Sequence, residues 1–122
     1  MVGVRPLLDE RAYGFATVHP RDPWPDALRP LATFEEAEGT SVIAPLEELE
    51  ALGLDPAGSW ALVTLGFESR LDGIGLTAKV SRALADASIP CNVVAAFHHD
   101  HLFVPWNRRA KALSILKETQ AP

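Results

Sequence analysis

Cysteine occurs only once in the 122 residues, at Cys91. A single thiol excludes an internal disulfide and a cysteine-rich metal site, and its apolar surroundings favour a buried, inert side chain. Long apolar runs are also missing, since none approaches the ~20 residues that a membrane span needs. The N-terminal stretch MVGVRPLLDERAYG lacks the apolar core of a signal peptide. We therefore expect a cytoplasmic protein with no membrane partner.

Basic residues are few, with 11 Lys and Arg against 16 Asp and Glu and a net charge of −5. The densest basic group, Arg108, Arg109 and Lys111, is expected to lack an aromatic platform, so we expect no nucleic-acid partner. The motifs GxSxG, GxGxxG and GxxxxGK are all absent, and the group Glu35, Glu36 and Glu38 is typical of a solvated face. The sequence therefore predicts no enzyme and no cofactor.

Hydrophobic residues make up 48% of the chain and charged residues 22%, which is ordinary for one globular domain. We expect a single domain over residues 1–122, in which residues 12–58 add strands and a short helix to a half formed by residues 59–119. Four of the ten prolines crowd the stretch HPRDPWPDALRP, which excludes a regular helix or central strand there. This stretch is predicted to be an ordered loop with a helical turn at Asp26–Leu28 and with Trp24 buried as its anchor.

The first half has short elements. Residues 13–18 form a β-branched and aromatic strand. Residues 32–44 predict two strands around Gly39, although residues 35–38 could equally form a helical turn. PLEELEALGL predicts a helix that Gly53 ends.

The second half has the order β-α-β-β-α. Apolar residues at i, i+4, i+7, i+8 and i+11 from Leu76 predict a helix over 73–88, and Asn107 is expected to cap the last helix. The predicted elements are strand 60–68, helix 73–88, strand 91–97, strand 102–104 and helix 107–118.

This order predicts a split βαβ unit, in which the return strand 102–104 lies between the other two strands. Both helices have one apolar stripe, so we expect them on the same face of the sheet. A complete unit needs one more strand, and residues 13–18 are the expected donor. The fold class is therefore α/β (α+β), an antiparallel sheet with helices on one face and extra N-terminal strands that complete the sheet.

The sequence HHDH, residues 98–101, holds three of the four histidines. It is typical of a polar hairpin turn in which Asp100 or His99 tolerates the turn geometry. A metal site is the second reading, although nothing else in the sequence supplies a third ligand at recognisable spacing. Ligand contact or pH sensing is the third. We expect the turn.

The loop ESRLDGIGLT, residues 68–77, precedes the long helix. Gly73 and Gly75 either allow tight strand-to-helix packing or let backbone amides approach a ligand carboxylate at the helix start. Asp72 either caps the helix or pairs with a ligand amine. Asn92 interrupts an apolar strand, so it is expected to be buried and to bond with neighbouring backbone or with a ligand.

The segment LDGIGLTAKVSRALADASIPCNVVAAF resembles the signature of the ACT domain. That signature is a strand end, a glycine-containing loop, a helix that begins near a small residue and an I-P-x-N entry to the next strand. With AYGFATV, TFEEAEGTSVIAP, DHLFVP and RRAKAL, the chain is similar over residues 12–118 to small bacterial ACT-like proteins. Its C-terminal part also resembles the ACT modules of the CASTOR arginine sensors.

The resemblance implies a ferredoxin-like sandwich and a module that binds an amino acid. It implies that the ligand's carboxylate meets the loop, with contacts from Asp72, Gly73, Ile74, Gly75, Leu76 and Asn92. The chain lacks the tandem ACT repeats of the sensors, between which their ligand sits. A site would therefore lie between subunits or between the two halves.

Our main interpretation is a non-enzymatic module that binds a small molecule, with an amino acid as the expected ligand. The alternative is a structural or interaction protein that has the fold and no ligand, and a third reading is a metal-dependent enzyme that uses His98–His101. A homodimer is expected because the strands offer more apolar surface than two helices can cover. The side chains expected on the sheet face that the helices leave uncovered are Trp60, Leu62, Val94 and Phe103.

Overall fold

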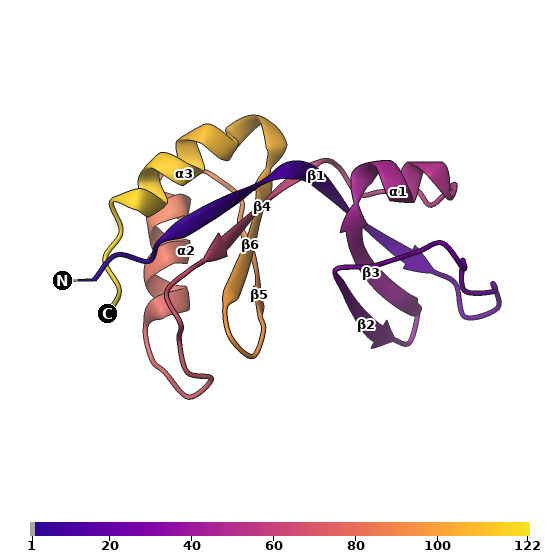
Figure 1. Ribbon diagram of the computed structural model, residues 1–122, viewed down its shortest axis with the longest axis horizontal. Coiled ribbons are helices and arrows are strands. Elements are labelled where there is room, and N and C mark those ends of the chain that lie inside the picture. Colours follow the sequence, from indigo (N-terminus) through magenta and orange to yellow (C-terminus); the bar gives the residue numbers. More distant parts are fainter. Residues whose placement is uncertain (1) are drawn as a thin grey trace. The chain divides into compact units, whose positions relative to one another are not determined.

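The computed structural model describes residues 2–122, and its six strands follow the order β2-β3-β1-β4-β6-β5 in an antiparallel α+β sheet (Figure 1). The chain divides into two compact units. Unit 1 contains the residues through Glu10 and Ala61–Pro122, and unit 2 contains Arg11–Trp60. The elements are β1 (Pro6–Val18), β2 (Ala32–Glu36), β3 (Gly39–Pro45), α1 (Leu46–Ala51), β4 (Trp60–Leu65), α2 (Leu76–Asp86), β5 (Asn92–Ala95), β6 (Asp100–Pro105), the 3₁₀ turn η1 (Trp106–Arg108) and α3 (Arg109–Lys117).

Unit 1 contains the predicted split βαβ. Strand β6 lies between β4 and β5 and pairs antiparallel with β5, with Val93 opposite Leu102. Helices α2 and α3 contact each other and share one hydrophobic core with β4 and β6. Both helices therefore lie on the same face of these strands, as the sequence predicts (Figure 1).

Alternation along the strands and 3.6-residue spacing along the helices build this core. In β4, every second residue from Ala61 points to the helices, and Phe67 beyond the strand end packs on the same core. The predicted stripe of α2 supplies Leu76, Val80 and Leu84, and α3 supplies Ala112 and Leu116. The fully buried members of this core are Val4, Ala61, Val63, Leu65, Val80, Leu84, Leu102, Val104, Ala112 and Leu116.

The strand that completes unit 1 is not the segment that the sequence predicts. Residues 13–18 pair with β3. Strand β1 instead begins at Pro6, and its first residues, through Glu10, belong to unit 1. Just before it, the carbonyls of Arg5 and Val4 accept hydrogen bonds from the Gly66 and Phe67 amides, at 2.7 and 3.1 Å. One strand, β1, therefore contributes residues to both units, which the local sequence pattern did not predict.

Unit 2 consists of β3 between β2 and the later part of β1, with α1 following β3. Two strands flank Gly39, so the alternative helical turn over residues 35–38 is wrong. Gly39 has φ of +150°, and a Cβ there would lie 2.6 Å from the Val18 carbonyl oxygen. The core of this unit is a second cluster formed by Val18, Leu28, Val42, Ala44 and Leu49.

Leu28, and not Trp24, anchors the proline-rich loop. The Trp24 side chain is 43% exposed, whereas Leu28 is 2% exposed and belongs to the core of unit 2. The predicted helical turn is a single turn, in which the Leu28 amide donates to the Pro25 carbonyl at 3.1 Å. Leu28 follows this turn and its side chain lies in the core, whereas Trp24 lies in the segment before the turn.

Several elements are shorter than predicted. Helix α2 begins at Leu76 and not at 73, because Gly75 has φ of +105°, which an α-helix cannot contain. Strand β4 ends at Leu65, and β5 covers Asn92–Ala95 only. Asn107 does not cap the last helix: it lies inside η1, and α3 starts without a side-chain cap.

The placement of the N-terminal segment predicts a matched pair of substitutions. Val4 is fully buried in the core of unit 1, and Leu7, three residues later, is 64% exposed. Val4→Asp places an unpaired charge in that core and should lower the free energy of unfolding by about 4 kcal/mol. Leu7→Asp should change it by about 0.5 kcal/mol or less. Urea denaturation measures both, and equal effects would contradict the placement of the N-terminal segment.

Gly75 generates a second prediction. Its φ of +105° is strained for any residue with a Cβ, so Gly75→Ala should cost about 1–3 kcal/mol of stability. Gly3→Ala is the control, because a Cβ there meets no atom within 4 Å and its φ is not positive. Thermal or urea unfolding should separate the two variants. A neutral Gly75→Ala would mean that α2 begins earlier, with helical backbone at Gly75.

Candidate functional site

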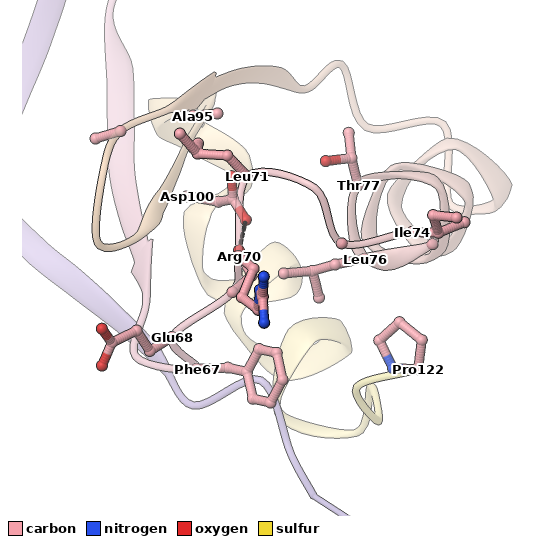
Figure 2. Close-up of a pocket in the computed structure, with 14 residues that line it drawn as sticks. Phe67, Glu68, Arg70, Leu71, Ile74, Leu76, Thr77, Ala95, Asp100 and Pro122 are labelled. Atoms are coloured by element: carbon pink, nitrogen blue, oxygen red, sulfur yellow. Dashed lines mark hydrogen bonds between the residues drawn. The ribbon is translucent and has the colours of Figure 1, made fainter.

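A pocket of about 450 Å³ lies in unit 1, where the loop between β4 and α2 faces the start of β6 (Figure 2). A volume of this size is typical of small-molecule sites. Its lining is formed by Phe67, Glu68, Ser69, Arg70, Leu71, Gly73, Ile74, Gly75, Leu76, Thr77, Ala95, Ala96, Asp100 and Pro122. Most of these residues come from one continuous loop, so the pocket depends on the conformation of that loop.

Asp100 is the buried charge of the pocket. It is 7% exposed, and its Oδ2 accepts a hydrogen bond from the Ser69 hydroxyl at 3.0 Å. Asp100 opens β6 opposite Ala95, and alternation puts its side chain on the same face as Leu102. Among residues 2–122, Oδ1 has no hydrogen-bond partner. The carboxylate therefore keeps an acceptor free toward the pocket.

The start of α2 also lines the pocket. Gly75 is its N-cap residue, and the first helical hydrogen bond runs from the Lys79 amide to the Gly75 carbonyl at 2.9 Å. The amides of Leu76 and Thr77, both in the lining, precede that bond and so have no partner within the helix. No side chain caps this end. Free amides and the helix dipole together favour a negative group here.

Arg70 and Asp72 form an exposed ion pair on the loop. Arg70 Nε and Nη2 donate to the two carboxylate oxygens of Asp72, at 3.0 and 3.2 Å. The Gly73 amide closes a turn on the Arg70 carbonyl at 3.0 Å. Asp72 does not cap α2, so the capping role weighed from the sequence is wrong. The loop continues past Asp72 to Gly75 before the helix starts.

Pro122 forms a wall of the pocket beside Gly75. A Cβ on Gly75 would lie 3.4 Å from Pro122 Cγ. The wall is held in place because the Ala121 amide donates to the Val2 carbonyl at 2.7 Å and Gln120 bridges antiparallel to Gly3. Residues from both ends of the sequence therefore support one side of the pocket.

The pocket gathers four of the six predicted site residues: Gly73, Ile74, Gly75 and Leu76. Asp72 and Asn92 lie outside its lining. Asn92 is exposed and not buried, because β5 is an edge strand and Asn92 points to the face opposite Val93, which packs on the core.

The pocket also contains residues that the sequence reasoning did not assign to it, above all Asp100, Ser69 and Phe67. The alternation of side chains along DHLFV could have predicted the position of Asp100. Since Leu102 and Val104 face the core, Asp100 must face the same side.

The prediction that HHDH forms a hairpin turn is correct for His98 and His99, but Asp100 and His101 already belong to β6. Strand β5 ends at Ala95, β6 begins at Asp100, and the Ala96 amide donates to the His99 carbonyl at 3.0 Å. His101 Nδ1 lies 2.9 Å from Thr64 Oγ1 in a hydrogen bond. Burial and the neighbouring His99 lower the pKa of His101, and Asp100 opposes this shift. Within residues 2–122, no three His, Cys, Asp or Glu side chains come together in a group that could hold a metal ion.

Cys91 is half-buried just before β5, and burial raises the pKa of its thiol to about 11. The thiolate is therefore scarce near neutral pH, which agrees with the expected inert thiol. Across residues 2–122, no helix has both the length and the apolar character needed to cross a membrane.

Models of the ACT domain match both halves of the chain, one over residues 57–118 and another over residues 1–60. A search of curated proteins gave no match. A crystal structure of a protein of unknown function from Vibrio cholerae, described as a possible transport protein, is 34% identical. It aligns with a TM-score of 0.86 over 96% of this chain and 90% of that chain.

Two more distant structures share the fold. A protein from Agrobacterium tumefaciens is 21% identical, with a TM-score of 0.75 over 95% of this chain and 88% of that chain. The regulatory subunit of aspartate kinase from Thermus thermophilus, in a ligand-free form, is 12% identical. Its TM-score is 0.64 over 98% of this chain and 99% of that chain. From the family models and the fold together, the chain belongs to the ACT domain family.

Proposed function

We propose that this chain is a non-enzymatic regulatory module whose pocket in unit 1 binds an amino acid. ACT domains commonly serve as regulatory modules that bind small molecules. The main support for an amino-acid ligand is the buried Asp100 carboxylate. It faces a pocket that the uncapped start of α2 also lines. An amino acid has the two charges that such a pocket needs.

In this arrangement the ligand's ammonium donates to Asp100 Oδ1, while Ser69 holds Oδ2. The ligand's carboxylate accepts from the free amides of Leu76 and Thr77. In this proposal the glycines at 73 and 75 keep the backbone accessible to the ligand, which is one of the two roles that the sequence left open for them. Direct contacts from Asp72 and Asn92 stay a prediction that this arrangement does not require.

The alternative of an interaction protein without a ligand is weaker because it leaves the position of Asp100 unexplained. Asp100 is 7% exposed, and its hydrogen-bond partner among residues 2–122 is the neutral Ser69 hydroxyl, so the carboxylate loses part of its hydration at a penalty. An ammonium ligand would offset that penalty through a charge-assisted hydrogen bond. The metal-dependent enzyme has less support, because the histidines of the turn point to different partners: His101 meets Thr64, and His98 lies 3.8 Å from Glu68. We retain a cytoplasmic location as part of the proposal.

Asp100→Asn tests the ammonium contact. The change keeps the size of the side chain and its bond to Ser69 but removes the charge, so amino-acid affinity should fall at least tenfold, or about 1.4 kcal/mol. Calorimetry with the twenty amino acids measures this in wild type and variant. Asp86→Asn is the control, because Asp86 pairs with Arg82 on the surface of α2 outside the pocket lining. Equal affinity in both variants would contradict the role of Asp100.

We also propose that the chain forms a homodimer, although the expected reason needs correction. Leu62 is 5% exposed and Phe103 is fully buried, so they do not form an open apolar face. Three of the eight large apolar side chains that are exposed among residues 2–122 lie at the pocket and the adjacent hairpin: Leu71 and Ile74 are 71% and 93% exposed and Phe97 is 76% exposed. Such surface is costly to leave in water.

Light scattering at micromolar concentration should therefore return about twice the 13.2 kDa mass of one chain. Replacing Ile74 by Ser should shift the population toward the monomer, whereas Leu7→Ser, at an exposed position outside the pocket lining, should not. A mass of 13.2 kDa for the wild type across the concentration range would refute self-association.

A further inference from the structure

The charges around the pocket limit what its ligand can carry. Three charged side chains belong to the lining: Glu68, Arg70 and Asp100. Glu68 and Arg70 are largely exposed, at 71% and 84% of their side chains. Figure 2 shows the Glu68 carboxylate pointing away from the other labelled side chains. Asp100 is thus the charge that a bound ligand would meet out of water.

Arg70 is already committed to Asp72. Both carboxylate oxygens of Asp72 accept from its guanidinium, so this exposed pair carries no net charge. If the ligand's ammonium neutralises Asp100 and its carboxylate meets the α2 amides, no buried charge is left for the ligand's side chain. A charged side chain would lose its hydration without a partner, which is unfavourable.

Apart from the hydroxyl groups of Ser69 and Thr77, the remaining side chains of the lining are apolar. Phe67 and Leu76 belong to or pack on the core of unit 1, so they hold their positions, and Pro122 is fixed through its neighbour Ala121. The other apolar side chains of the lining are Leu71, Ile74, Ala95 and Ala96. These walls offer dispersion contacts and removal from water, but no hydrogen bond from a side chain.

From this balance we propose, resting on the amino-acid site above, that the pocket selects an amino acid with an uncharged, apolar side chain of several carbons. Each additional buried methylene should tighten binding by about fourfold, the equivalent of ~0.8 kcal/mol. The opposite arrangement, with a cationic side chain on Asp100, leaves the ligand's ammonium without a buried anion. It therefore predicts the reverse order of affinities.

Calorimetry with a straight-chain series decides between these arrangements. Alanine, 2-aminobutyrate, norvaline and norleucine should bind progressively more tightly, about fourfold per methylene. Norleucine and lysine share the same carbon chain and differ by the terminal ammonium, so norleucine should bind at least tenfold more tightly. Pentylamine and hexanoate, which each lack one of the two charged groups, should bind at least tenfold more weakly than norleucine.

A substitution in the pocket lining also tests the selectivity. Ala95 is exposed and lies opposite Asp100 in the β5–β6 pair, so Ala95→Asp adds an acid beside the ligand without filling the core. The ratio of lysine to norleucine affinity should rise at least tenfold. Ala27→Asp, the same change at an exposed position in unit 2, should leave the ratio unchanged.

These experiments distinguish failure of the amino-acid site from failure of its selectivity. If no amino acid binds the wild type, the amino-acid site and its selectivity are both overturned. If amino acids bind and lysine is preferred over norleucine, or affinity does not rise along the series, the selectivity alone is overturned. Binding of pentylamine or hexanoate as tight as that of norleucine would overturn the requirement for two charged groups.

Discussion

The hydrogen bonds between the N-terminal segment and the end of β4 are the constraint on which unit 1 depends. The carbonyls of Val4 and Arg5 accept from the amides of Phe67 and Gly66, and Val4 fills the core that α2 and α3 cover. With these bonds the β-α-β-β-α half gains the fourth strand that a ferredoxin-like unit needs, although this strand comes from the start of the sequence. The same segment bonds to Ala121 and so holds the wall of the pocket that contains Pro122.

The pocket forms at the loop between β4 and α2, where neither a regular strand nor a helix is present. After Phe67 the chain turns at Arg70 and reaches Gly75, whose positive φ delays the start of α2 to Leu76. This delay places the uncapped first amides of the helix at residues that line the pocket. A residue with a Cβ at position 75 would favour a different approach to the helix, so the glycine determines where the helix starts and which amides remain uncapped.

Strand β6 serves the core and the pocket with one alternating pattern. Its inward residues are Asp100, Leu102 and Val104, so the face that packs on the helices ends in a carboxylate at the pocket. The outward residue His101 bonds to Thr64 instead. The carboxylate of Asp100 and the imidazole of His101 therefore lie on opposite faces of the strand.

Local sequence patterns determined much of this protein. The 3.6-residue stripe from Leu76 to Leu84, the alternation in β4 and the glycine between β2 and β3 predicted the elements. The split βαβ order and the ACT resemblance predicted the family. These features were readable because each depends on residues close together in the chain.

Only the tertiary structure decided which strand completes unit 1, where α2 begins and which carboxylate enters the pocket. The N-terminal segment and β4 are about sixty residues apart, so no local periodicity reveals that they pair. The exposure of Trp24 and Asn92 depends likewise on which strand lies at an edge and which side chain closes a loop. Burial is a property of the packed chain, and Asp100 is in the pocket because a distant loop, through Ser69, reaches it.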